Sequence, residues 1–255
     1  MDNGTSISEK IDIWNNLLAK ELIPNNVILS LYIITGLVGN LTVIFIYGVK
    51  LKDSKEERYF IPYLATADLC ASSVSASFGM ALNLMQTKFE NTYVCKTGWF
   101  FAAFTTFTSI LILLAIAVHR YRKICKPLGK QMTLKWKRIA LCLGIIIAFL
   151  LALPTTHFYG SVPFRNDEKG IVGLRCSRVK TVNKTGSLIF GGGLLLTAIA
   201  IIVSLICLYA KMGYTIIMHF KFMNTKGKKK AFSEPEHPKN IEEPRSADDL
   251  VSGTE

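Results

Sequence analysis

Uncharged, apolar stretches alternate along the chain with short segments that are rich in Lys and Arg. Five stretches, each at least 21 residues long, contain a single charged residue between them, Asp68. They cover residues 22–49, 59–86, 97–118, 139–159 and 185–210. Because a helix needs about 20 apolar residues to cross a bilayer core, each stretch predicts a membrane-spanning helix. We expect an all-α membrane protein with five transmembrane helices, at about 27–49, 59–86, 96–124, 138–159 and 186–218.

The composition supports a membrane protein over a soluble one. Half of the residues (50%) are hydrophobic and only 19% are charged, which is too apolar for an ordinary soluble domain of 255 residues. Buried helices of a large soluble protein are the alternative. Five long apolar stretches that are separated only by short basic segments would leave that protein too little polar surface.

The charges of the connecting segments predict the orientation of the helices. Residues 50–58 carry four Lys or Arg and residues 120–138 carry eight, whereas residues 87–93 carry only one. The positive-inside rule therefore places the first and third connections in the cytoplasm and the N-terminus outside. Six basic residues in the long connection 160–184 weaken this bias. We expect a multi-pass protein of the plasma membrane, or one that is retained in the endoplasmic reticulum.

The net charge of +12 lies mostly beside the predicted spans, so anionic membrane lipid is the expected partner rather than nucleic acid. Residues 1–26 are expected to form an extracellular N-terminal tail before the transmembrane domain at 27–222. Residues 223–255 are charged, rich in Pro and nearly free of large apolar residues, which predicts a disordered cytoplasmic tail. Glycosylation sequons at Asn3 and Asn183 fall on the outer side.

In this topology, only two of the six cysteines, Cys95 and Cys176, lie on the extracellular side. That compartment is oxidising. The other four cysteines lie within the spans or at the cytoplasmic edge, where disulfides rarely persist. We therefore expect a Cys95–Cys176 disulfide that holds the long connection over the outer end of the helices.

Asn40, Asp68 and Ser109 lie at nearly the same depth on three different predicted helices. At 1.5 Å per residue, they are roughly 14–16 Å from the cytoplasmic ends of these helices. A membrane-buried Asp is costly unless it is protonated, paired or bound to a cation. Two interpretations stay open. Either a protonated Asp68 bonds to its neighbours, or Asp68 and Ser109 supply the charge and a neutral oxygen to a Na⁺ site.

Arg120 follows Cys95 by 25 residues, which is roughly 38 Å of helix and enough to cross the whole membrane. The segment "HRYRKICKPL" at Arg120, "GNLTVI" at Asn40 and "LATADL" at Asp68 resemble the rhodopsin-like (class A) G-protein-coupled receptors. The resemblance covers residues 27 to about 220, and the tail that follows resembles a third cytoplasmic loop. Other positions match the spacing of the family: Ser109, Pro154 and Tyr209.

The resemblance implies roles for these residues. A sodium pocket would be formed by Asp68, Ser109 and Asn40, with Na⁺ as an allosteric ion. The Cys95–Cys176 bridge would be structural. The side that faces a heterotrimeric G protein would carry five residues of the motif and the fifth helix: His119, Arg120, Tyr121, Pro127 and Tyr209.

The chain also departs from the family. His119 stands where the family has an acid that pairs with Arg120, so the restraint on the resting state would be weaker or sensitive to pH. Gly144 replaces the usual Trp of helix four, and Ile201 the usual Pro of helix five. Helices six and seven do not follow. The chain would thus correspond to the first five helices of a seven-helix bundle and would not couple a ligand to G-protein activation on its own.

The ligand is weakly constrained by the sequence. Ala102 stands where amine receptors carry an Asp, which argues against an amine. The basic outer connection suits a peptide, such as a neuropeptide, with acidic groups. The alternative is that this connection is only a solvated loop.

Three functions remain open. The first is an incomplete receptor of the peptide type, and the second is a five-helix product that regulates full-length relatives by forming hetero-oligomers. An unrelated five-span transporter or channel is the third. The sequence shows no metal cluster, nucleophile–base pair or phosphate-binding loop, so we do not expect an enzyme.

Overall fold

The computed structural model describes residues 6–47, 58–168, 170–179 and 184–232. The chain divides into two units, residues 1–212 and 213–255. The packing described below lies within the first unit.

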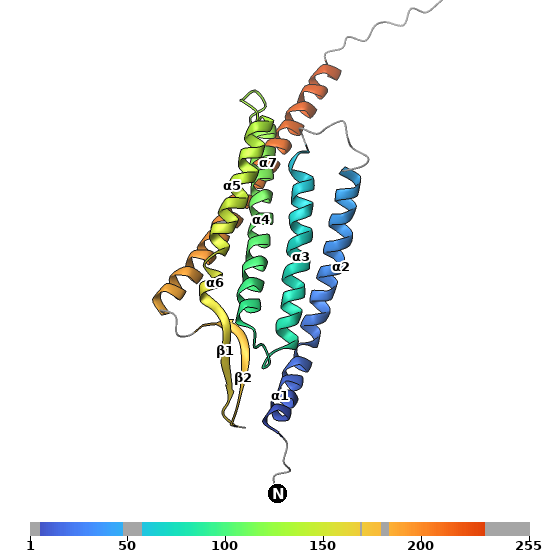
Figure 1. The fold of residues 1–255 in the computed structure, drawn as a ribbon. Helices are drawn as coiled ribbons and strands as arrows, with labels where there is room; N and C mark the ends of the chain where they lie inside the picture. Colours follow the sequence, from blue (N-terminus) through green and yellow to red (C-terminus); the bar gives the residue numbers. More distant parts are fainter. Residues whose placement is uncertain (1–5, 48–57, 169, 180–183, 233–255) are drawn as a thin grey trace, which may run out of the picture. The chain divides into compact units, whose positions relative to one another are not determined.

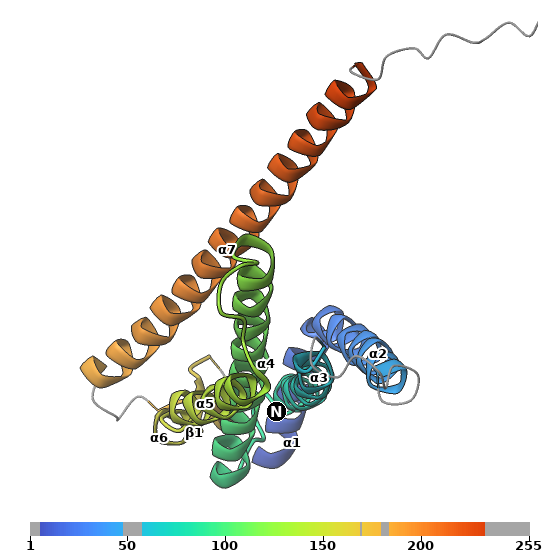
Figure 2. The ribbon, with the colours of Figure 1, turned by 90° about the horizontal axis from the view of Figure 1, so that it is seen from above.

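Four long helices follow one another in space as they do in the sequence (Figure 1): α2 (Ile23–Phe45), α3 (Phe60–Leu84), α4 (Thr92–Cys125) and α5 (Leu134–Ala152). Each helix packs against the next one along the chain. Seen from above, α3 lies between α2 and α4 (Figure 2). Short connections between consecutive helices favour this neighbour-to-neighbour packing.

Among the described residues, four helical segments are long and apolar enough to cross a membrane: Ile23–Phe45, Thr92–Cys125, Leu134–Phe158 and Leu188–Thr225. Helix α3 has 25 residues, which also suffices for a span, and it carries several polar side chains. Two of those polar side chains, Ser72 and Asn83, are buried. The predicted all-α membrane fold is confirmed. Helix α3 was also predicted as a span, and it is not among the four segments above.

Small and polar residues join α2 to α3. A Cβ atom on Gly36 of α2 would lie 2.4 Å from the Ser72 Oγ atom of α3, so only glycine permits this approach. Nearer the beginning of α2, the Asn83 side-chain nitrogen donates a hydrogen bond of 2.7 Å to the Asn26 side-chain oxygen. Close backbone approach and interhelical hydrogen bonds are the forces that hold helices together in lipid, where apolar burial contributes little.

The two ends of α4 organise the rest of the structure. We call the end that carries Arg120 the Arg120 end; there, side chains of α3, α4 and α5 form an apolar cluster: Phe60, Ile112, Ile116 and Leu141. We call the opposite end the hairpin end, because an antiparallel hairpin of β1 (Tyr159–Asn166) and β2 (Ile171–Arg178) lies there (Figure 1). The sequence did not predict these strands. The short helix α6 (Thr155–Phe158) joins α5 to β1.

Much of the predicted N-terminal tail, residues 1–26, is helical, and the sequence did not predict this helix. Helix α1 (Ile7–Glu21) is capped by Ser6, whose side-chain oxygen accepts a 3.2 Å bond from the Glu9 N–H, and α2 starts at Ile23 rather than near 27. A Ser followed three residues later by Glu is the signature of a capping box. That signal, with apolar residues at helical spacing, could have predicted α1.

Helix α7 (Lys184–Phe232) extends well past residue 218, where we expected the last helix to end. Residues 223–232 are therefore helical and not disordered as predicted. The segment from Met218 to Phe232 contains no proline, and the next one is Pro235, so no residue type forces the helix to stop earlier. The rest of the predicted tail lies outside the described residues.

Candidate functional site

Asp68 and Ser109 meet between α3 and α4. The Ser109 Oγ atom donates a short hydrogen bond to the Asp68 Oδ1 atom, and both side chains are partly buried. The equal depth inferred from the sequence thus corresponds to direct contact. A carboxylate and a hydroxyl offer hard oxygen atoms, the ligand type that suits Na⁺, so these two residues fit the ion that the receptor resemblance implied.

Asn40, the third predicted member of this group, bonds within its own helix. Its Nδ2 atom donates to the Gly36 carbonyl oxygen at 2.9 Å. Among the contacts of the described residues, none joins Asn40 to Asp68. The structure therefore brings together two of the three predicted residues.

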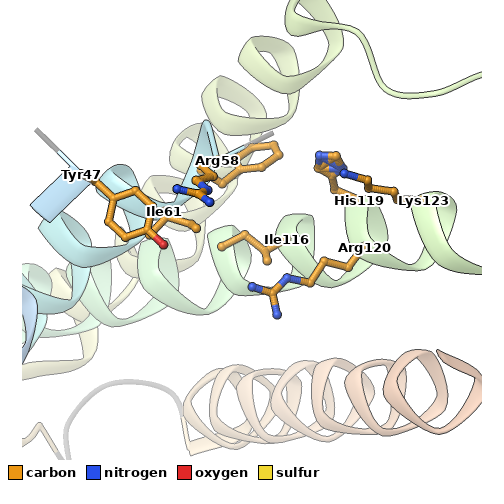
Figure 3. A pocket seen from close by; sticks show the side chains of 8 residues that line it. Tyr47, Arg58, Ile61, Ile116, His119, Arg120 and Lys123 are labelled. Carbon is orange, nitrogen blue, oxygen red and sulfur yellow. The ribbon is translucent and has the colours of Figure 1, made fainter. Parts of the chain in front are cut away.

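A pocket of about 280 Å³ opens at the Arg120 end (Figure 3). Its lining comes from the segment directly after α2, the segment before α3, α3 itself and α4. Four of the lining side chains are basic or carry an imidazole: Arg58, His119, Arg120 and Lys123. The other four are aromatic or aliphatic: Tyr47, Phe60, Ile61 and Ile116. Within the part of the chain that the structure describes, no acidic side chain lines it.

His119 and Arg120 leave α4 in different directions (Figure 3). The His119 ring packs edge-on against Phe60 with 6.2 Å between ring centroids, and its buried Nδ1 atom has no hydrogen-bond partner among the described residues. Arg120 is exposed, and no ion pair between described residues restrains it. His119 therefore packs as an aromatic ring and supplies no negative charge to Arg120.

The other residues predicted to face a partner lie around this end. Tyr121 is partly buried on α4, and Pro127 is exposed in the connection to α5. Gln131 donates to the Pro127 carbonyl oxygen at 3.3 Å, which folds this connection back on itself. Tyr209 lies on α7, where it is 42% exposed. No contact among the described residues joins Tyr209 to Arg120.

The predicted Cys95–Cys176 disulfide is confirmed and joins the start of α4 to β2. Both cysteines are buried and pack with Phe89. Next to them, the rings of Trp99 and Tyr159 stack with a centroid distance of 4.3 Å. The disulfide and this stack together fix the hairpin to α4. The predicted glycosylation sites Asn3 and Asn183 lie outside the described residues.

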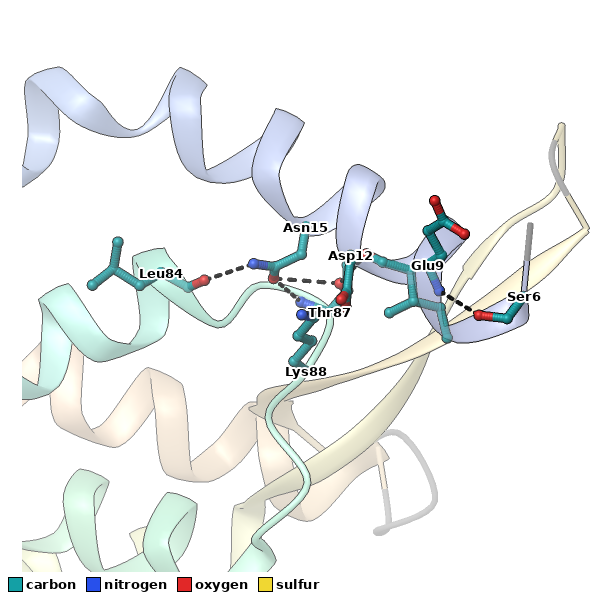
Figure 4. A network of polar contacts seen from close by, with 8 residues as sticks. Ser6, Glu9, Asp12, Asn15, Leu84, Thr87 and Lys88 are labelled. Atoms are coloured by element: carbon teal, nitrogen blue, oxygen red, sulfur yellow. Dashed lines mark hydrogen bonds and ion pairs between the residues drawn. The ribbon is translucent and has the colours of Figure 1, made fainter.

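Helix α1 contributes a polar network that sequence reasoning missed (Figure 4). The Asn15 Nδ2 atom donates to the Leu84 carbonyl oxygen at 2.8 Å, and the Asn15 Oδ1 atom accepts from the Thr87 N–H at 3.0 Å. Beside it, Asp12 forms an ion pair with Lys88. Because the Asn15 amide is buried, it fastens α1 to the turn after α3.

Comparison with known proteins decides what this bundle is. A family model described as "7 transmembrane receptor (rhodopsin family)" matches residues 39–241. The chain belongs to this receptor family. The family is a class of receptors and not of enzymes, so the expectation that the chain is no enzyme is confirmed.

Several receptors are similar to this receptor chain. The substance-P receptor of Aquarana catesbeiana is 25% identical over 174 residues, which cover 66% of this chain and 40% of that protein. Olfactory receptor 9S13 of Mus musculus is 31% identical over 154 residues, covering 54% and 46%. The gastrin/cholecystokinin type B receptor of Sus scrofa is 31% identical over 110 residues, covering 43% and 24%. The chain thus spans less than half the length of each of these relatives.

Membership of the family gives the geometry its context. The receptor chain is a multi-pass membrane protein with a rhodopsin-like arrangement of its helices and a disulfide between α4 and the hairpin. The transporter and channel alternatives are therefore excluded. At the Arg120 end of this chain, an imidazole ring occupies the position beside Arg120.

Proposed function

We propose that this chain serves a receptor that binds an extracellular peptide at the hairpin end and acts on a heterotrimeric G protein at the Arg120 end. Two of its relatives are a substance-P receptor and a gastrin/cholecystokinin receptor, whose names state peptide ligands. The exposed, unrestrained Arg120 beside a basic pocket is the single observation that supports the G-protein contact most directly.

The hairpin end has the chemistry for a peptide with acidic groups. The disulfide holds β2 against the start of α4, so the basic side chains of the hairpin are presented by a rigid element. Arg175 lies over the ring of Phe164, with 5.3 Å between its guanidinium carbon and the ring centroid. An arginine that is oriented by an aromatic ring loses less entropy when it binds a carboxylate.

Asp68 and Ser109 would couple the hairpin end to the Arg120 end energetically. Their contact joins α3 to α4 near the middle of the bundle, and α4 carries Arg120 at one end and Cys95 at the other. Here Na⁺ would supply a cation that favours one packing of these helices. A ligand changes the balance between two conformations only by its differential affinity for them. An ion that binds between α3 and α4 in one packing satisfies this requirement.

The test is G-protein activation in cells that express a seven-helix receptor containing this chain and are exposed to a panel of acidic peptides. We expect one class of peptide to stimulate nucleotide exchange, and we expect the variant Arg120→Ala to abolish the response while surface expression is preserved. A response that survives Arg120→Ala would contradict the assignment of the Arg120 end. Activation by amines or small organic molecules, without any peptide response, would contradict the peptide assignment.

A further inference from the structure

The pocket at the Arg120 end has an unusual charge balance. Arg58, Arg120 and Lys123 line a single volume of about 280 Å³, and no acidic side chain of the described residues lines it with them. The buried His119 Nδ1 atom at the same pocket has no hydrogen-bond partner among those residues. The guanidinium groups of Arg58 and Arg120 offer several N–H donors that suit an anion. The pocket is therefore suited to a negatively charged ligand.

The depth of the pocket indicates where that ligand comes from. The uncharged stretch of α4, residues 97–118, is 22 residues long, or roughly 33 Å of helix, which matches the thickness of a bilayer hydrocarbon core. His119, Arg120 and Lys123 follow this stretch directly. They lie at the level where the head groups of phospholipids begin, so lipid phosphates reach this depth.

The side chains fit a phosphate group. Arg58 lies over the Tyr47 ring, with 5.8 Å between its guanidinium carbon and the ring centroid, so its planar fork is oriented by an aromatic neighbour. An arginine fork matches phosphate oxygens with two parallel charge-assisted hydrogen bonds. The volume of about 280 Å³ is close to the low end of the range of ligand pockets, which suits a compact, charged head group.

We propose that this pocket binds the phosphate of an anionic phospholipid head group, which gives Arg120 the negative partner that His119 cannot provide. Basic pockets between transmembrane helices on the cytoplasmic side are suited to phosphoinositide head groups. The assignment to the inner leaflet rests on the proposed function, because that proposal places the Arg120 end in the cytoplasm. Binding of the phosphate itself rests only on the pocket.

The proposal has a regulatory consequence. A phosphate bound beside Arg120 accepts charge-assisted hydrogen bonds from its guanidinium group and so restrains this side chain. The bound lipid and a G protein then compete for one arginine, and reciprocity requires that each lowers the affinity of the other. The receptor would therefore have a lower basal activity in membranes that are rich in phosphoinositide.

The experiment measures lipid binding without G protein or peptide, so its failure leaves the proposed function untouched. The receptor is reconstituted in phosphatidylcholine nanodiscs with a small fraction of fluorescent phosphatidylinositol bisphosphate. Energy transfer to this lipid is then titrated with unlabelled lipid. We expect Arg58→Ala to weaken binding about ten-fold, which corresponds to roughly 1.4 kcal/mol. Arg58→Lys keeps the charge without the fork, so an intermediate loss is expected.

The matched control is Lys135→Ala. It removes one positive charge from an exposed side chain at the same end of the bundle, outside the pocket. This variant should bind the lipid within about two-fold of the unchanged receptor, since the charge is lost only from a diffuse surface. Equal losses in Arg58→Ala and Lys135→Ala would overturn the proposal, because binding would then be diffuse attraction to a basic surface.

Soluble inositol trisphosphate separates the two sources of phosphate. We expect it to displace the lipid only at concentrations far above that of the unlabelled lipid, since it lacks the membrane anchor. Displacement at equal concentration would show that the pocket takes a free phosphate and would overturn the lipid assignment. A melting curve for each variant excludes a general loss of folding as the cause.

Discussion

At the scale of single residues, the Asp68–Ser109 contact is a polar interaction that joins α3 to α4 inside the bundle. We expect Ser109→Ala to lower the free energy of unfolding by about 1 kcal/mol, because Asp68 loses a donor where water cannot replace it. Thermal denaturation in detergent measures this loss. The control is Ser204→Ala, which removes a hydroxyl that bonds only to its own helix, at the Ala200 carbonyl oxygen. Equal melting temperatures for the two variants would show that Asp68 gains nothing from Ser109.

His119 is the residue that most distinguishes the Arg120 end. In a seven-helix receptor that contains this chain, we expect His119→Asp to reduce basal nucleotide exchange about three-fold, because the new carboxylate can pair with Arg120 at the energy of an exposed ion pair. The control His119→Asn has nearly the same shape without the charge and should leave basal exchange unchanged. A fall of the same size in both variants would mean that the loss of the aromatic contact with Phe60 is the cause.

At the scale of elements, α1 is held to the hairpin end by a few specific contacts. We expect Asn15→Ala to cost about 2 kcal/mol locally, because the Leu84 carbonyl and the Thr87 N–H lose their buried partner. Hydrogen exchange of residues 7–21 should speed up markedly, while that of α3 and α4 stays unchanged. The exposed neighbour Asn16 provides the control, and Asn16→Ala should leave the exchange of α1 as it is. Fast exchange of α1 in the unchanged receptor would contradict this docking.

The sequence predicted the elements that are marked by a long uncharged stretch. It missed the elements whose structure depends on contacts with residues far away in the chain. The helices α2, α3, α4 and α5 follow from long uncharged stretches, because lipid requires every backbone group to be satisfied within the helix. The β1–β2 hairpin has no comparable signal, since its order depends on the disulfide at Cys176 and on the Trp99–Tyr159 stack.

The candidate sites follow the same division. Equal depth predicted that Asp68 and Ser109 lie close together, and they form a hydrogen bond. Depth says nothing about the direction in which a side chain leaves its helix, and the hydrogen bond that Asn40 donates stays within its own helix. The interaction of Asn15 with Leu84 and Thr87 could not be predicted, because its partners are backbone groups about 70 residues away. Backbone acceptors carry no signature in the sequence.

At the scale of the whole molecule, the orientation in the membrane remains a prediction that follows from charge. Basic residues gather at the Arg120 end: Arg120, Arg122, Lys123, Lys126, Lys130 and Lys135. Translocating these charges is unfavourable, so the Arg120 end should stay in the cytoplasm while the hairpin end, with α1 and the disulfide, lies outside. The oxidising environment that the Cys95–Cys176 bridge needs is the extracellular one, which agrees with this orientation.

Two labels test this orientation in intact cells. An epitope placed before Met1 should be stained in intact cells. An epitope placed after Glu255 should be stained only in permeabilised cells. In this orientation Asn183 is accessible to the glycosyltransferase. Asn183→Gln should therefore increase the electrophoretic mobility of the protein, because one glycan is lost. The control Asn166→Gln breaks no sequon and should leave the mobility unchanged. Staining of the C-terminal epitope on intact cells would show that the orientation is the opposite of the predicted one. In that case the Arg120 end would face the extracellular space, and neither a G protein nor an inner-leaflet lipid could reach it.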